Sequence, residues 1–574
     1  MASSTSEKFN RLFNVKEQIR KAINRKGVRV PETLPLEQYA NKIEAIPFYD
    51  YNSPDADFEN FISTYYTVTA SKGYQFYQNT SLQHLDTNEI SYLTRMGFST
   101  VPNLINAFYG CTALQNVAAV SFTNVTSAQS AFYSCTALRN IDLSIESNIS
   151  NMDNMFSNCI NLSTLKLNIV SYSSSMSCSN MFSNTNLHTL TNDSQISLSL
   201  PSFNSIFASS NITDLSFLKF TSLTSTANSA SWSAMFSGCA SLKNIDLPNE
   251  FTYTPPTSLN SMFASTTFLT SEHMSNVQAF FNKLDKSSLS SMSTMFRYKQ
   301  TYFDHLNLEI TLPIEGQSCS INNMFSSRDS SVTYIAAGRG PVTYFKFNGA
   351  GSASELFSEY SSYPDNTSYH PLTEVITIDL PYVTTLSQAF LNCSYLEQVH
   401  NFTTGTNLTN VSSMFSGCKR LTAIPLFNTT NVTTMNQMFY GCAALANVPT
   451  FDTSSCYNFG YMFYNCSSLI SVPSFNLNAL SQNSNWGTAY TSTSNPLYYM
   501  FYGCTSLAAI HMQNIKSSFD ISYSTAFTRE ALLEILDNLV DVSAARVLHM
   551  GQTNLDKLTA EDIAIATAKG WTLN

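Results

Sequence analysis

The sequence predicts an α/β repeat solenoid, an elongated stack of similar units joined through parallel strands. Three observations favour this fold. A motif centred on phenylalanine recurs every 24 or 25 residues, each copy repeats the same apolar spacing, and a chain of 574 residues is too long for one compact core. One such unit cannot bury its apolar face alone, so neighbouring copies must stack on one another.

The repeat is clearest in six copies, which begin near Ala107 (AFYGCTAL) and Asn410 (NVSSMFSGCKRL). The separation of the motif phenylalanines grows to between 26 and 38 residues in the middle and at the last copy, which indicates loops inserted on a constant frame. The motif residues are Phe108, Phe132, Phe156, Phe182, Phe207, Phe236, Phe263, Phe296, Phe325, Phe357, Phe390, Phe415, Phe439, Phe463 and Phe501. Fifteen rungs at one strand spacing each predict a stack roughly 70 Å long.

The first half of a unit has apolar residues three or four positions apart. This spacing places them on one face of a short helix or helical turn. In one unit they are Val432, Met435, Phe439, Cys442 and Leu445. We therefore expect each unit to contain a turn and a helical segment.

The second half of a unit reads L-x-x-I-x-L. Its last two apolar positions alternate, as in a strand with one buried face. Two examples are Leu138, Ile141 and Leu143, and Leu421, Ile424 and Leu426. A short parallel strand is therefore expected at both places.

Cysteine follows the same period. Nine of the twelve cysteines lie three residues after the motif phenylalanine: Cys111, Cys135, Cys159, Cys239, Cys393, Cys418, Cys442, Cys466 and Cys504. This spacing does not provide the C-x-x-C pairs of zinc sites, so no metal is expected. Since free cysteine is among the most buried residue types, we predict a column of buried free thiols.

This pattern resembles the BspA-type leucine-rich repeats of bacterial surface and phage-encoded proteins. The resemblance covers about residues 101–525 and is strongest at 107–162 and 410–469. It is weaker between Tyr172 and Leu380, where residues such as Thr185, Ser210 and Thr266 replace the motif cysteine. It implies a leucine-rich-repeat solenoid used for recognition and not for catalysis.

The two ends differ from the repeats. Residues 526–574 are expected to form a helical cap, with Thr528 and Thr559 as N-caps of two helices. A short strand is expected near Val547 to Met550. Residues 48–100 are expected to form the opposite cap and the first irregular repeats.

Residues 1–47 carry nine basic and five acidic side chains and predict two short helices. Their apolar positions are Leu12, Val15, Ile19 and Ile23 in the first helix and Tyr39 and Ile43 in the second. The segment resembles a small N-terminal module of tailed-phage structural proteins, which implies an anchor that docks into another virion protein or oligomerises, with a homotrimer as one arrangement. A helical cap for the solenoid is the simpler alternative.

Composition excludes several functions. Charged residues make up 12% of the chain and the net charge is −10, so the basic face of a nucleic-acid-binding protein is not expected. No apolar run reaches the ~20 residues of a membrane span, and the first residues lack a secretory signal. No nucleophile elbow, metalloprotease motif or phosphate-binding loop appears. We therefore expect no enzyme, no cofactor and a chain made in the cytoplasm.

Aromatic residues in an insertion suggest a binding site. Residues 483–499 read NSNWGTAYTSTSNPLYY, and the predicted binding residues are Trp486, Tyr490, Tyr498 and Tyr499. Such rings supply rigid contact area beside polar groups, which suits a glycan or a protein receptor. The alternative is that they only cover the repeat core.

Three classes of function remain. The first is a virion fibre, tail or decoration protein, anchored by residues 1–47 and displaying the solenoid for host attachment. The second is a bacterial cell-surface adhesin of the same repeat type. The third, a glycan-degrading enzyme, lacks recognisable catalytic residues.

Overall fold

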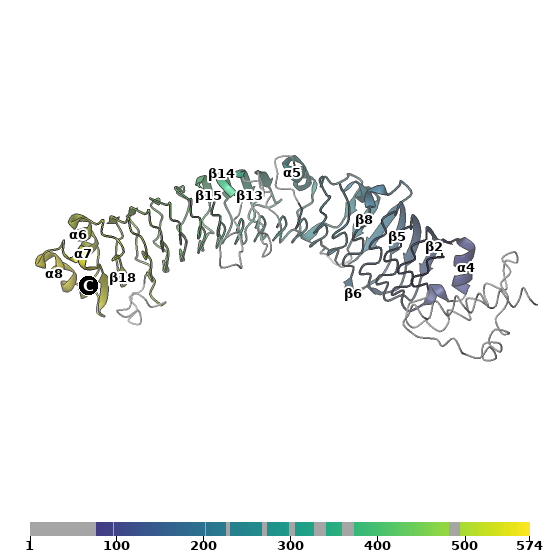
Figure 1. The fold of residues 1–574 in the computed structure, drawn as a ribbon, viewed down its shortest axis with the longest axis horizontal. Coiled ribbons are helices and arrows are strands. Elements are labelled where there is room, and N and C mark those ends of the chain that lie inside the picture. Colours follow the sequence, from purple (N-terminus) through teal and green to yellow (C-terminus); the bar gives the residue numbers. More distant parts are fainter. Residues whose placement is uncertain are drawn as a thin grey trace, which may run out of the picture.

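The computed structural model describes residues 76–95, 97–200, 202–225, 230–266, 273–297, 305–326, 340–358, 372–480 and 494–574. Figure 1 shows one elongated, curved rod of stacked rungs, with α4 near one end, α5 near the middle and α6, α7 and α8 at the other end. The predicted solenoid of parallel strands is confirmed. The expected N-terminal module, residues 1–47, lies outside the described residues.

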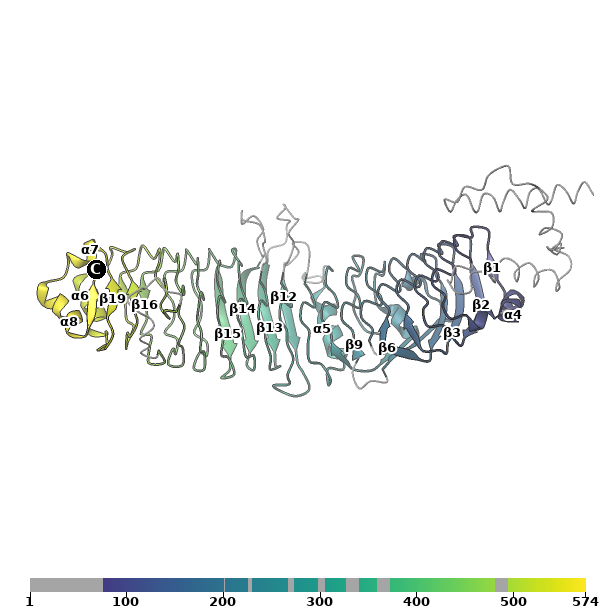
Figure 2. The ribbon, with the colours of Figure 1, turned by 90° about the horizontal axis from the view of Figure 1, so that it is seen from below.

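Two parallel sheets follow one face of the rod (Figure 2). The first has the order β1 (His84–Leu85), β2 (Asn116–Phe122), β3 (Asn140–Ile145), β5 (Thr164–Ile169), β7 (Gln195–Ser199), β8 (Thr221–Thr224) and β10 (Thr252–Tyr253). The second has the order β12 (Leu306–Ile310), β13 (Gly340–Phe347), β14 (Leu372–Leu380) and β15 (Gln398–Thr404). Smaller parallel pairs are β4 (Ile149–Asn151) with β6 (Tyr172–Ser177), β9 (Ala230–Ser231) with β11 (Pro256–Ser258), and β16 (Ser471–Val472) with β17 (Ala509–Ile510). Short 3-10 helices lie at η2 (Phe98–Thr100), η3 (Leu187–Thr189) and η4 (Ser216–Phe220).

The strand prediction is confirmed in one of its two examples. Ile141 and Leu143 point into the core from β3. No strand forms at 421–426, where Leu426 is 62% exposed and Phe427 is buried in its place. Pro425 lies in this segment and has no N–H to donate to a strand ladder, which explains the irregular backbone there.

The helical prediction for the first half of the unit is wrong. The five residues Val432, Met435, Phe439, Cys442 and Leu445 are all buried as expected, but their backbone forms consecutive tight turns. Turns that close from Met435 to Met438 and from Phe439 to Cys442 have Gln437 and Gly441 at their third position. Both have positive φ, 57° and 72°, which is the conformation that a type II turn requires at this position.

These turns let one rung bond to the next. In the Phe439 rung, the N–H groups of Gln437, Phe439 and Gly441 donate to carbonyls of the following rung at 2.8, 2.9 and 2.7 Å. An α-helix would direct the same N–H groups along its own axis. The left-handed residues therefore convert a helix-like apolar spacing into a ladder that runs along the solenoid.

The motif phenylalanines form a continuous column of stacked rings. Consecutive ring centroids lie close together, for example 4.8 Å between Phe108 and Phe132 and 6.0 Å between Phe463 and Phe501. Phe76, which is not among the predicted motif phenylalanines, stacks on Phe108 at 4.8 Å and adds a sixteenth ring. Stacked aromatic pairs stabilise a fold beyond the contribution of the area that they bury. This column is therefore the main axis of the core.

The cysteine column has a specific partner. Each motif thiol donates to the carbonyl of the motif phenylalanine one rung earlier, for example Cys159 to Phe132 at 3.2 Å and Cys442 to Phe415 at 3.1 Å. All twelve cysteines are free and buried, as predicted. Burial raises the pKa of the Cys159 thiol from 9.0 to about 12, so the column stays neutral in the folded chain.

These thiols predict a loss of stability in alkali. An unfolded thiol releases its proton near pH 9, whereas folded Cys159 holds its proton to about pH 12. The folded pKa is the higher one, so the stabilisation is complete below pH 9 and declines as pH rises above it. We expect the urea midpoint of the reduced chain to fall between pH 9 and pH 10.5. A variant with Cys159→Ala and Cys442→Ala should show a shallower decline, and an identical decline would contradict this explanation.

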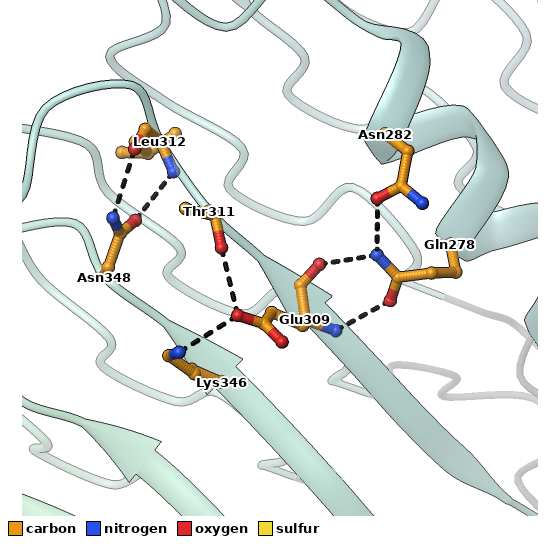
Figure 3. A network of polar contacts seen from close by, with 7 residues as sticks. All are labelled: Gln278, Asn282, Glu309, Thr311, Leu312, Lys346 and Asn348. Carbon is orange, nitrogen blue, oxygen red and sulfur yellow. Dashed lines mark hydrogen bonds and ion pairs between the residues drawn. The ribbon is translucent and has the colours of Figure 1, made fainter.

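Helix α5 (Met274–Lys283) separates the two sheets and was not predicted. Figure 3 shows how it meets the edge strand β12. The Gln278 side-chain amide donates to the carbonyl of Glu309 and accepts from its N–H, both at 2.9 Å. Gln278 thus bonds to the strand edge as a neighbouring strand would, which satisfies backbone groups that the missing strand leaves open.

The C-terminal cap has the predicted helices. In α6 (Arg529–Asp537) the Thr528 side chain accepts from the N–H of Ala531, and in α8 (Ala560–Ala568) Thr559 forms a capping box with Asp562. The short α7 (Gln552–Leu555) lies between them, and β18 (Phe519–Asp520), β19 (Arg546–His549) and β20 (Trp571–Leu573) form a parallel sheet. Helix α4 (Thr87–Arg95) lies beside β1 and β2 near the opposite end. No helix in the described part of the chain has the length and apolarity needed to span a membrane.

Candidate ligand-binding surface

Seven tyrosines gather on the solenoid near its C-terminal end. We call this group the tyrosine platform: Tyr440, Tyr461, Tyr464, Tyr498, Tyr499, Tyr502 and Tyr523. Tyr523 is 37% exposed and the others are partly buried. The platform therefore lies at the surface, above the phenylalanine column.

The repeat itself builds one row of this platform. Tyr440, Tyr464 and Tyr502 each follow a motif phenylalanine, so stacking of the rungs stacks their rings. Their centroids are 4.7 and 4.6 Å apart and the ring planes are nearly parallel. Because the faces of these rings cover one another, the row presents ring edges and hydroxyl groups to the solvent. One hydroxyl group lies at each rung.

A second group lies against this row at steep angles. Tyr461 and Tyr498 meet edge to face at 4.7 Å, and Tyr499 meets Tyr502 edge to face at 5.5 Å. Tyr498 and Tyr499 also contact each other at 4.6 Å. The result is a compact aromatic surface with rings in several orientations.

Two platform residues have a strained backbone. Tyr461 and Tyr499 have φ of 56° and 45°, at the turn position where most other rungs carry Asn, Ser or Gln. Bulky residues rarely adopt positive φ, and such a conformation costs about 1–3 kcal/mol. Every rung holds a left-handed residue at this position, so the conformation belongs to the repeat, and the feature particular to this surface is that tyrosine occupies the position in two rungs.

We expect Tyr461→Asn to change the free energy of unfolding by less than about 1 kcal/mol. Relief of a left-handed conformation, worth about 1–2 kcal/mol, offsets the loss of ring contacts worth about 0.5–1.5 kcal/mol. Chemical denaturation of the two proteins tests this. A loss as large as that of a core substitution would show that Tyr461 is a packing residue.

The platform is uncharged. Residues 421–515 contain no Lys, Arg or Glu and a single Asp, Asp452. Asp452 bonds to Ser454 and lines a separate groove with Leu426. Burial and the neighbouring Tyr498 raise the pKa of Tyr461, and burial with the neighbouring Tyr440 raises that of Tyr464, so the hydroxyls stay protonated at physiological pH.

The structure describes two of the four predicted binding residues. Tyr498 and Tyr499 lie together in the platform. Trp486 and Tyr490 lie outside the described residues, as do the predicted anchor residues Leu12, Val15, Ile19, Ile23, Tyr39 and Ile43. Tyr440, Tyr464 and Tyr502 were not predicted, although their shared place after the motif phenylalanine is a signal for them.

A polar groove of about 630 Å³ beneath α5 is the second surface feature. It is lined by Gln278, Phe281, Asn282, Lys286, Asn307, Glu309, Thr311 and Tyr344. Its central Glu309 carboxylate already accepts from Lys346 at 3.0 Å and from Thr311 at 3.2 Å (Figure 3). Lys346 lowers the pKa of Glu309, which keeps the pair ionised. These contacts join β12 to β13, and Gln278 joins α5 to β12, so we assign the groove a structural role.

The described residues offer little for catalysis. No three His, Cys, Asp or Glu side chains among them lie together in a way that would hold a metal ion. Two of the histidines, His400 and His511, pair with Glu374 and Glu534 at 2.6 and 2.7 Å on the surface.

The stacked rungs and the parallel strands define a leucine-rich-repeat solenoid. Residues 104–213 match, in six copies, a family model described as the BspA type leucine rich repeat region. Residues 384–498 and 409–530 match a model described as a Mycoplasma protein of unknown function, DUF285. Residues 104–213 thus carry BspA-type leucine-rich repeats, as the motifs predicted. No curated protein matches its sequence.

Two solved structures of bacterial leucine-rich-repeat proteins are weakly similar. One, from Eubacterium ventriosum ATCC 27560, is 10% identical over 64% of this chain and 80% of that chain, with a TM-score of 0.26. The other, from Bacteroides ovatus ATCC 8483, is 13% identical over 82% of this chain and 86% of that chain, with a TM-score of 0.24. Neither likeness supports a functional assignment.

Proposed function

We propose that this chain is a non-catalytic recognition protein that is displayed at a bacterial surface and binds its target through the tyrosine platform. The observation that carries the proposal is the gathering of seven tyrosines at one surface, where Tyr461 and Tyr499 occupy turn positions that most other rungs fill with Asn, Ser or Gln. Tyrosine clusters of this kind are typical of binding surfaces, because each ring gives a large contact area at low entropic cost.

A bacterial origin, and with it the adhesin alternative, is supported by the description of the DUF285 model, which names a Mycoplasma protein of unknown function. The virion alternative depends on residues 1–47, which are the segment expected to dock with other virion proteins. That docking, a homotrimer and a virion location stay predictions. Detection of the chain in purified virions, or on the surface of intact bacteria, separates the two locations.

Binding to intact cells tests the proposal. Labelled full-length chain is added to cells of the producing species and of its hosts, and retention is compared with that of Tyr464→Ser. Tyr464 stacks between Tyr440 and Tyr502, so we expect its loss to lower retention about thirtyfold or more, as for a central binding residue worth 2 kcal/mol or more.

Tyr109→Ser provides a matched control. Tyr109 also follows a motif phenylalanine and also stacks between two tyrosines, Tyr77 at 5.1 Å and Tyr133 at 4.8 Å. It lies near the other end of the rod, so its loss should alter stability similarly and leave retention unchanged. Equal retention of the wild type and Tyr464→Ser on every cell type would refute the proposal.

A further inference from the structure

We infer that the ligand of the tyrosine platform is an uncharged, extended glycan chain that lies along the solenoid axis. This inference rests on the proposed function and specifies its target. Three features of the platform lead to it: the absence of charge, the hydroxyl chemistry and the spacing of the rungs.

The absence of charge argues against an ionic ligand. A carboxylate, phosphate or sulfate group loses hydration on binding, and this cost is recovered only if a cation or several donors replace the water. The 95 residues from 421 to 515 supply no Lys or Arg, and the platform tyrosines come from this stretch apart from Tyr523. A typical protein ligand also presents charged groups at its interface rim, which would find no complement here.

The hydroxyl groups match a ligand rich in hydroxyls. A tyrosine O–H both donates and accepts a hydrogen bond, as does the hydroxyl of a sugar. The pKa values of Tyr461 and Tyr464 are raised by burial and by the tyrosines beside them, so both hydroxyls stay protonated at physiological pH. Exposed Asn465, which directly follows Tyr464 in the sequence, adds an amide to this region.

The spacing matches a repeating polymer. Tyr440, Tyr464 and Tyr502 recur at 4.7 and 4.6 Å, which is close to the length of one sugar residue in an extended chain. A linear glycan along the axis would therefore meet the same chemical group at each rung. Tyr461, Tyr498 and Tyr499 flank the row at other angles, where they can contact the apolar C–H surface of the sugar rings.

Affinity electrophoresis of the full chain tests the inference. The gels contain one of three neutral polymers, hydroxyethylcellulose, a β-1,4-linked mannan or a β-1,4-linked xylan, and carboxymethylcellulose serves as the charged counterpart of the first. We expect retardation by at least one neutral polymer and weaker retardation by the charged one. Retardation by none of the neutral polymers, or equal or stronger retardation by carboxymethylcellulose, overturns the inference.

Variants locate the binding. Tyr464→Ser should abolish the retardation and Tyr109→Ser should leave it unchanged. Tyr464→Phe keeps the ring and removes the hydroxyl, so it should weaken binding about three- to tenfold, as expected for one hydrogen bond. An unchanged affinity in Tyr464→Phe, or equal losses in Tyr464→Ser and Tyr109→Ser, would contradict the assignment of the hydroxyl row.

Failure of this inference differs from failure of the proposed function. If cells retain the chain through Tyr464, and protease treatment of the cells but not periodate oxidation removes the retention, the ligand is a protein and only the glycan inference falls. If cells retain the wild type and Tyr464→Ser equally, the recognition role of the platform falls as well. Loss of retention after periodate alone, with retardation by a neutral polymer, supports both.

Discussion

Replacement of Phe439 by alanine is expected to lower the stability of the solenoid by about 3–5 kcal/mol, as for other buried phenylalanines. Phe439 has no exposed surface and stacks between Phe415 at 5.9 Å and Phe463 at 5.6 Å. Its removal leaves a cavity in the column and deprives both neighbours of a ring. The midpoint of thermal unfolding should fall, and hydrogen exchange should accelerate in its own rung and in the two beside it.

The matched control is Phe439→Leu, which keeps part of the volume and should cost clearly less. A second control is Tyr457→Ser, since Tyr457 is 56% exposed and should contribute little. If Phe439→Ala unfolds at the same temperature as the wild type, the phenylalanine column is not the axis of the core.

Replacement of Gly405 by alanine is expected to cost up to about 3 kcal/mol, the upper range for overpacking a tight site. Gly405 follows β15 and faces the preceding rung so closely that an added Cβ would lie 1.9 Å from the carbonyl oxygen of Pro381. The Pro381 carbonyl belongs to the main chain and cannot rotate away as a side chain can. The strands β14 and β15 would therefore have to separate. Chemical denaturation measures the loss.

Gly441→Ala separates this steric effect from backbone strain. Gly441 has a φ of 72° and no atom within 4 Å of an added Cβ, so alanine there should cost only about 1–2 kcal/mol for the left-handed conformation. The expected order is a larger loss for Gly405→Ala than for Gly441→Ala. The reverse order would show that the close approach of neighbouring rungs at Gly405 does not determine the loss of stability.

Much of the architecture could be predicted from the sequence, because each rung must bury the same positions. The period, the buried column and the free thiols followed from the spacing of Phe439, Cys442 and their counterparts. The conformation of the first half of the unit could not be predicted in this way, because apolar residues three and four positions apart fit a helix and a pair of turns equally. The distinguishing signal was the Gly or Asn two residues after the phenylalanine, as at Gly441, which marks positive φ and not a helix interior.

The binding surface could be predicted only in part. Tyr498 and Tyr499 stood out because they adjoin each other in an aromatic insertion. Tyr464 and Tyr502 are 38 residues apart and become neighbours only when the rungs stack at 4.6 Å. Helix α5 was missed for a related reason, because its contact with β12 through Gln278 replaces a strand that the repeat pattern leads one to expect.

The most direct test of the central claim is hydroxyl-radical footprinting of the full chain, free and bound to the cells that retain it. The platform is predicted to become protected: Tyr440, Tyr464 and Tyr502 should be oxidised several-fold more slowly in the bound chain, while Tyr109 reacts at an unchanged rate. Protection of Tyr109, or of Tyr344 in the groove beneath α5, with no change at the platform would contradict the account.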